Sequence, residues 1–173
     1  MNTRFLVRAA LYAALYAVLT LAPGLNALAY GQVQFRLAEA LTVFACVDPA
    51  AVPGLTVGTA LGNLGSPMFL ADVVFGSLLT LIAVAIMQRL GPRLVALAVP
   101  VVVNGLGVAI LLAVLLDLPF WASAVWVGAG EAAVMATAGA ALLVLVRRRT
   151  DLFGLTHHPA GGPGGAAASG RGG

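Results

Sequence analysis

Long apolar runs separated by short polar breaks organise this 173-residue chain. A helix of about 20 apolar residues crosses a hydrocarbon core ~30 Å thick. The runs predict long helices over residues 4–21, 69–90, 94–116 and 120–146, with two shorter helices between residues 36 and 65. The predicted fold class is therefore an all-α integral membrane protein, a bundle of six transmembrane helices of which the second and third are short.

The stretch from Arg36 to Gly65 leaves the number of crossings open. Its thirty residues, broken by a turn at Asp48-Pro49, give only ~45 Å of helix at 1.5 Å per residue. That length is barely enough for two crossings of a thinned membrane. Six spans fit the sequence, but four would fit as well if this stretch only dipped into the membrane.

Composition supports the membrane assignment and limits the chemistry. The chain is 61% hydrophobic and 9% charged, with a mean hydropathy of +1.04, whereas soluble domains carry about 25% charged residues. It contains no lysine, so the lysine-bearing phosphate loop of an ATPase is absent. If ATP drives transport here, another subunit must bind it.

Arginine placement predicts the orientation. Arginines flank the apolar runs at residues 4, 8, 89, 93 and 147–149, whereas Asp117 lies in a loop on the opposite side. The positive-inside rule then places both termini in the cytoplasm of a multi-pass cell-membrane protein. Residues 1–150 form the predicted membrane domain. The Gly/Ala/Pro-rich residues 151–173 are predicted to be a disordered cytoplasmic tail, because such a composition cannot bury a core.

Polar residues inside the apolar chain are the candidate ligand contacts, since an ionisable residue at membrane depth indicates a functional site. By the predicted topology they fall in the outer half or near the midplane, which favours a pocket loaded from outside over a continuous pore. The predicted substrate-binding residues are Gln32, Gln34, Arg36, Glu39, Asn63, Asp72, Asn104 and Glu131.

Three of the acidic residues have different alternatives. Glu39 follows Arg36 by three residues, so the two could form a purely structural ion pair on one helix face. Asp72 could merely cap its helix. Glu131 has no basic neighbour in sequence and must be protonated, paired across helices or bound to a ligand. Asn104 is predicted near the same depth as Glu131.

Catalysis, cofactors and metals find no support in the sequence. Both histidines, His157 and His158, lie in the predicted tail, and neighbouring acidic residues are at least nine positions apart. No catalytic residue, cofactor or metal site is therefore predicted. Helix 4–21 carries small residues every four positions at Ala9, Ala13 and Ala17, which permit close helix packing either within the bundle or against another subunit.

Several motifs occur in an order that resembles the QueT family. They cover residues 4–147, and the blocks at residues 36–41 and 72–77 are the most specific. The matching runs are Gln34–Leu41, Pro53–Leu55, Asn63–Leu64, Asp72–Thr80, Pro100–Asn104 and Gly130–Glu131.

The resemblance implies a substrate-binding S component of an energy-coupling factor (ECF) importer for a queuosine precursor, a 7-deazaguanine such as preQ1 or queuine. Its partners would be a transmembrane coupling subunit (EcfT-like), two cytoplasmic ATPases and the bilayer, with no nucleic acid. The stripe of Ala9, Ala13 and Ala17 would then contact the coupling subunit. The alternative is a self-sufficient, proton-coupled transporter of a small polar or cationic heterocycle, which uses protonation of Glu131.

Overall fold

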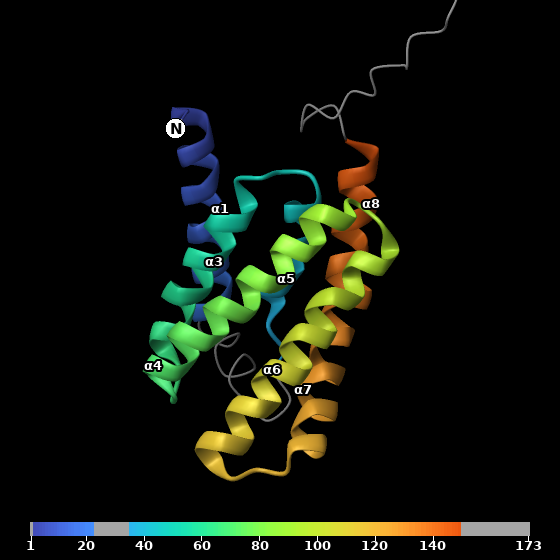
Figure 1. The fold of residues 1–173 in the computed structure, drawn as a ribbon. Coiled ribbons are helices and arrows are strands. Elements are labelled where there is room, and N and C mark those ends of the chain that lie inside the picture. Colours follow the sequence, from blue (N-terminus) through green and yellow to red (C-terminus); the bar gives the residue numbers. More distant parts are fainter. Residues whose placement is uncertain (1, 23–34, 150–173) are drawn as a thin grey trace, which may run out of the picture.

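The computed structural model describes residues 2–22 and 35–149, and all regular structure in those ranges is helical (Figure 1). Among these residues, four helices are long and apolar enough to cross a membrane. They span Thr3–Leu21, Phe69–Leu90, Leu94–Leu116 and Phe120–Arg148. The predicted long helices are confirmed to within two residues at each end. Gln32, Gln34 and the tail from residue 151 lie outside the described residues, so their roles stay predictions.

Three of these helices are composite. Short 3-10 or π-helical segments adjoin the α-helical parts without ending the helix, and π turns often occur at functional sites. In chain order after α1 (Thr3–Leu21), the parts are α4 (Phe69–Ala71), the π turn η3 (Asp72–Gly76), α5 (Ser77–Leu90), the 3-10 turn η4 (Leu94–Leu97), α6 (Ala98–Leu116), α7 (Phe120–Val134), the π turn η5 (Met135–Gly139) and α8 (Ala140–Arg148).

The stretch between α1 and α4 forms two short helices, as predicted. The first, η1 (Leu37–Cys46), is a 3-10 helix of 10 residues, and the second, α3 (Ala51–Gly62), is an α-helix of 12 residues that ends in the 3-10 turn η2 (Asn63–Gly65). At about 2.0 and 1.5 Å per residue, they measure only ~20 Å and ~18 Å. Neither reaches across a ~30 Å core, so the count of six transmembrane helices stays a prediction.

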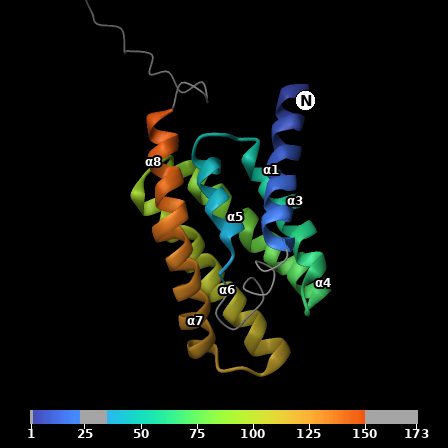
Figure 2. The same cartoon turned by 180° about the vertical axis from the view of Figure 1, so that it is seen from behind.

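The short helix η1 lies in the interior of the molecule. Eight of its ten residues are buried, and it packs against α1, α3, α5, α7, η5 and α8. In Figure 1, α1 and α3 lie on one side, the α6–α8 hairpin lies on the other, and α5 crosses between them. Figure 2, the view from behind, shows η1 in cyan between α1 and α8. Any polar side chain on η1 is therefore surrounded by helices.

Glycines set the close approach of α1 and α3. A Cβ atom added at Gly58 would lie 2.8 Å from the Cβ of Tyr16 and 2.9 Å from the carbonyl oxygen of Ala13. One added at Gly54 would lie 2.5 Å from the carbonyl oxygen of Ala9. Small residues every four positions permit this packing in a membrane, where close van der Waals contact drives helix association.

The arginines that flank the long helices gather at one end of the bundle. Arg8 of α1 pairs with Asp48 in the η1–α3 turn, and Arg147 of α8 donates a hydrogen bond to the carbonyl oxygen of Pro92 at 2.6 Å. Figure 1 shows the N-terminus and the end of α8 at this same end, and the α6–α7 loop at the other. Trp121, which begins α7 near that loop, is 75% exposed, as expected of a residue that anchors at the membrane interface.

Candidate substrate-binding site

Four of the predicted site residues converge in the interior. Arg36, Glu39, Asn104 and Glu131 are all buried, with at most 8% of each residue exposed. The amide nitrogen of Asn104 donates a hydrogen bond to Oε1 of Glu131 at 3.4 Å. The Arg36 guanidinium interacts electrostatically with both carboxyl groups. Arg36 and Glu39 therefore share these buried surroundings with Asn104 and Glu131, and the ion pair expected between them stays a prediction.

The backbone brings these residues together from three elements. Arg36 directly precedes η1, and Glu39 lies in its first turn. Asn104 lies on α6 and Glu131 on α7, helices that run antiparallel and pack closely. Gly105 permits this approach, because a Cβ atom there would lie 3.3 Å from the Cα atom of Gly128. The cluster therefore sits where the α6–α7 pair meets η1.

A tyrosine that the sequence reading did not single out completes the cluster. Tyr16 of α1 is fully buried, and its hydroxyl donates a hydrogen bond to Oε1 of Glu39. Elsewhere in the interior, the Thr59 hydroxyl on α3 lies 3.2 Å from the Thr80 hydroxyl on α5. The available signal was a pair of tyrosines, Tyr12 and Tyr16, one turn apart on a largely aliphatic helix.

One carboxylate oxygen of the cluster is not engaged by the described residues. Oε2 of Glu39 is buried and has no hydrogen-bond partner among the described residues. A buried oxygen without a partner is costly, and native structures satisfy nearly all such groups. With Glu39, Glu131 and Arg36 all ionised, the formal charge is −1. The arrangement can therefore accept a hydrogen bond from, or pair with the positive charge of, a small bound molecule.

Asn63 and Asp72 form a separate cluster with Ser66, at the junction of α3 and α4. The Asn63 amide donates a hydrogen bond to the carbonyl oxygen of Asp72 at 2.6 Å, and the Ser66 hydroxyl donates one to Oδ2 of Asp72. These bonds join η2 to the π turn η3. The structure does not bring Asn63 and Asp72 to Glu39, so their role as ligand contacts stays a prediction.

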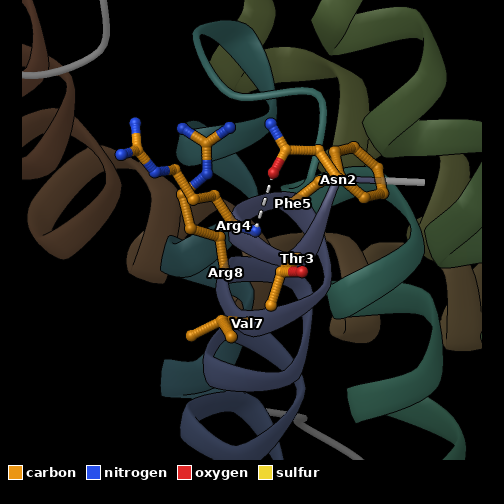
Figure 3. Close-up of a pocket in the computed structure, with 6 residues that line it drawn as sticks. All are labelled: Asn2, Thr3, Arg4, Phe5, Val7 and Arg8. Atoms are coloured by element: carbon orange, nitrogen blue, oxygen red, sulfur yellow. Dashed lines mark hydrogen bonds between the residues drawn. The ribbon is translucent and has the colours of Figure 1, made fainter.

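A third polar group, also missed, surrounds Asp48 at the basic end. Its Oδ2 accepts a hydrogen bond from the Tyr12 hydroxyl at 3.1 Å and lies 3.4 Å from the Arg8 guanidinium. Its Oδ1 accepts one from the backbone N–H of Ala50 at 2.9 Å. Figure 3 shows Arg8 beside Arg4 at a pocket of about 720 Å³ around the start of α1. Within residues 2–22 and 35–149, no group of three or more His, Cys, Asp or Glu could hold a metal.

Comparison with known proteins decides the family, because the model of the QueT transporter family matches residues 6–148. The chain belongs to the QueT transporter family. It is 38% identical over 81 residues to the queuosine precursor transporter QueT of Lactococcus lactis subsp. cremoris (strain MG1363). That match covers 47% of each chain, so it spans about half the length of this curated relative. No solved structure matches the chain.

The alanine stripe of this QueT-family chain is divided between two environments. Ala13 is buried against Gly58 of α3, and Ala9 and Ala17 are half-buried. For Ala13, packing within the bundle is therefore confirmed. The small residues that α1 leaves exposed are Ala10 and Ala14, one position further along. Contact of the stripe with a coupling subunit stays a prediction.

Proposed function

We propose that this chain is the substrate-binding S component of an ECF-type importer for a queuosine precursor, a 7-deazaguanine such as preQ1 or queuine. One observation carries the proposal: Arg36, Glu39, Asn104 and Glu131 meet in the interior of a QueT-family chain, and Oε2 of Glu39 has no hydrogen-bond partner in the part of the chain that the structure describes. The name of the Lactococcus relative supports the substrate class.

The chemistry of a 7-deazaguanine suits this cluster. Its ring edge carries N–H donors that a carboxylate accepts, and its exocyclic oxygen needs a donor such as the Arg36 guanidinium or the Asn104 amide. An aminomethyl cation, as in preQ1, would pair with the second carboxylate, Glu131. We include Gln32, Gln34, Asn63 and Asp72 in the proposed site as further contacts.

The partners follow from what the chain lacks. It has no lysine and hence no lysine-bearing nucleotide loop, so an ATP-driven importer needs separate ATPases and a transmembrane coupling subunit. We assign the contact with that subunit to α1, through the half-buried Ala9 and Ala17 and the exposed Ala10 and Ala14 beside them, whereas Ala13, predicted to share this contact, faces α3. Both termini are cytoplasmic in this proposal, as the arginine placement predicts.

The test is binding by the purified chain in detergent, without ATP. We expect saturable binding of radiolabelled preQ1 or queuine, and co-purification of ATPase subunits from native membranes. Glu131→Gln should weaken this binding. An absence of binding by folded, monodisperse protein would contradict the proposal.

The second candidate is a proton-coupled transporter that works alone. The buried Glu131, with Asn104 as its hydrogen-bond partner, is the observation that favours it, because transporters move protons through such carboxylates. Liposomes that contain only this chain separate the two proposals. Uptake of preQ1 driven by a proton gradient, and lost in Glu131→Gln, would establish the transporter and exclude the S component.

A further inference from the structure

The buried hydroxyl of Tyr16 touches the proposed site but has no role in the function argued so far. We infer that Tyr16 is a positioning residue for substrate binding: it holds Oε1 of Glu39 so that Oε2 is presented to the substrate. This inference rests on the proposed function, since it concerns the same site. It also connects that site to α1, the helix to which we assign contact with the coupling subunit.

Tyr16 restrains one of the two carboxylate oxygens of Glu39, Oε1, and leaves Oε2 available to a ligand. Tyr16 is 0% exposed and Glu39 is 1% exposed, so water does not compete for their hydrogen bond. In such surroundings a hydrogen bond to a charged group is shorter and stronger than one between neutral groups. With Oε1 bonded to Tyr16, rotation of the carboxylate would break this bond. Oε2 is therefore fixed in direction before any ligand arrives.

The packing of α1 against α3 also restrains Tyr16. A Cβ atom added at Gly58 would lie 2.8 Å from the Tyr16 Cβ, so α3 packs directly against the base of the Tyr16 side chain. Tyr16 is thus held by packing against α3, while its hydroxyl holds Glu39 on η1.

The hydrogen bonding of Glu39 limits which ligand groups fit this position. Glu39 uses one oxygen internally and offers the other, so it suits a ligand that brings one N–H or ammonium donor to this position. A fork of two adjacent N–H groups would have to share Oε1 with the Tyr16 hydroxyl. A site tuned in this way rejects analogues without the donor, because Oε2 would stay buried and unpaired.

Tyr12 supplies a matched control for the experiment. It lies one turn earlier on α1, is also buried, and donates its hydroxyl hydrogen bond to Asp48 at the basic end. Tyr12→Phe and Tyr16→Phe are therefore the same chemical change on the same helix. Binding of radiolabelled preQ1 and queuine would be measured for both variants, for Glu39→Gln, and for Tyr16→Phe combined with Glu39→Gln.

We expect Tyr16→Phe to weaken binding about tenfold, and Tyr12→Phe to change it less than about twofold. In the Glu39→Gln background, Tyr16→Phe should add less than about twofold, because the carboxylate that it positions is already altered. If Tyr16→Phe does not fold, Gly58→Ala places a Cβ atom 2.8 Å from the Tyr16 Cβ, which displaces the Tyr16 side chain and should weaken binding about two- to tenfold.

Two outcomes would overturn the inference while leaving the proposed function intact. One is wild-type binding that Tyr16→Phe does not change. The other is an equal loss from Tyr16→Phe with and without Glu39→Gln, which would mean that Tyr16 acts independently of Glu39. Folded wild-type protein that binds neither probe would contradict the proposed function, and the inference with it.

Discussion

Two tyrosines one turn apart on α1 each donate a hydrogen bond to a buried carboxylate, and the two carboxylates differ in what else they contact. Asp48 uses both oxygens: Oδ2 faces Tyr12 and Arg8, and Oδ1 accepts from the backbone of the next turn. Glu39 uses Oε1 for Tyr16, and its Oε2 has no partner among residues 2–22 and 35–149.

This difference separates a structural carboxylate from a binding one. A buried carboxylate whose oxygens are all bonded contributes to folding and has nothing left to offer a ligand. One with an unpaired oxygen carries a desolvation cost in the empty protein that a ligand can relieve. Proteins tolerate such local conflicts mainly at functional sites. Removal of Asp48 should therefore lower stability, whereas changes at Glu39 should lower affinity.

The largest expected effect is on ligand affinity. Glu39→Gln and Glu131→Gln should each weaken preQ1 binding by about ten- to hundredfold, because the loss of a hydrogen bond to a charged group costs about 1.5–3 kcal/mol. Asp48→Asn should change affinity less than about threefold. Isothermal calorimetry on detergent-solubilised protein measures all three. If Asp48→Asn weakened binding as much as Glu39→Gln, the two carboxylates would not differ in their role in binding.

A paired substitution tests whether Glu39 only neutralises Arg36. Joint replacement of a purely structural ion pair by apolar residues is often neutral, because the desolvation of two charges offsets their attraction. Arg36→Met with Glu39→Leu should instead abolish binding in folded protein. Unchanged affinity in that double variant would make Glu39 structural and leave Glu131 and Asn104 as the centre of the site.

Much of this architecture could be predicted from the sequence, for identifiable reasons. The long helices follow apolar runs that end at Pro and Gly, such as Gly91-Pro92 before η4 and Pro119 before α7. Counting residues inward from the ends places Asn104 and Glu131 at one depth, and their side chains do meet. Depth and chemistry were sufficient because only five of the described buried residues carry a carboxyl or guanidinium group, and Glu131 is one of them.

The remaining features depend on which neighbour a residue faces, and spacing does not encode this. Asn63 and Asp72 share the expected polarity but bond across the α3–α4 junction, and Ala13 faces α3. Tyr16 was overlooked because its ring matches an apolar helix pattern, while its single polar atom reaches Glu39. The apolar pattern of residues 37–46 likewise indicated a short helix but not its 3-10 form.

The second prediction concerns stability at the structural carboxylate. Asp48→Asn should reduce the free energy of unfolding by about 1–3 kcal/mol, because it removes the charge opposite Arg8 and presents an NH₂ group to a buried site of donors. Thermal unfolding in detergent measures the change. Tyr12→Phe should show a smaller loss of the same kind. Wild-type stability for Asp48→Asn would mean that this carboxylate is not structural.

The third prediction tests the spacing of α1 and α3 on which both tyrosines depend. Gly58→Ala places a Cβ atom 2.8 Å from that of Tyr16, and such overpacking costs about 1–3 kcal/mol. Alanine has a higher helix propensity than glycine, which stabilises the helix by up to ~1 kcal/mol. We therefore expect the free energy of unfolding to fall by about 0–2 kcal/mol in Gly58→Ala. Gly128→Ala is the control, because its added Cβ atom meets nothing within 4 Å. Greater damage from Gly128→Ala would contradict the helix packing described here.

The smallest expected effect is that of Arg8 on Asp48. Their ion pair measures 3.4 Å, but the Arg8 side chain is 49% exposed, so solvent screens the attraction. Exposed pairs contribute about 0–1 kcal/mol, and Asp48 keeps its bonds from Tyr12 and Ala50 without Arg8. Arg8→Gln should therefore lower the free energy of unfolding by less than about 1 kcal/mol and leave affinity unchanged.

Two controls, added salt and a substitution at a second arginine, show whether the small loss of stability in Arg8→Gln comes from its ion pair with Asp48. Raising ionic strength to about 1 M shortens the screening length to about 3 Å, so the difference between wild type and Arg8→Gln should shrink. Arg4→Gln, one turn earlier on α1, removes the same charge without touching the pair with Asp48 and should show no such dependence. A loss above about 2 kcal/mol for Arg8→Gln would mean that Arg8, and not Tyr12, provides most of what holds Asp48 in place.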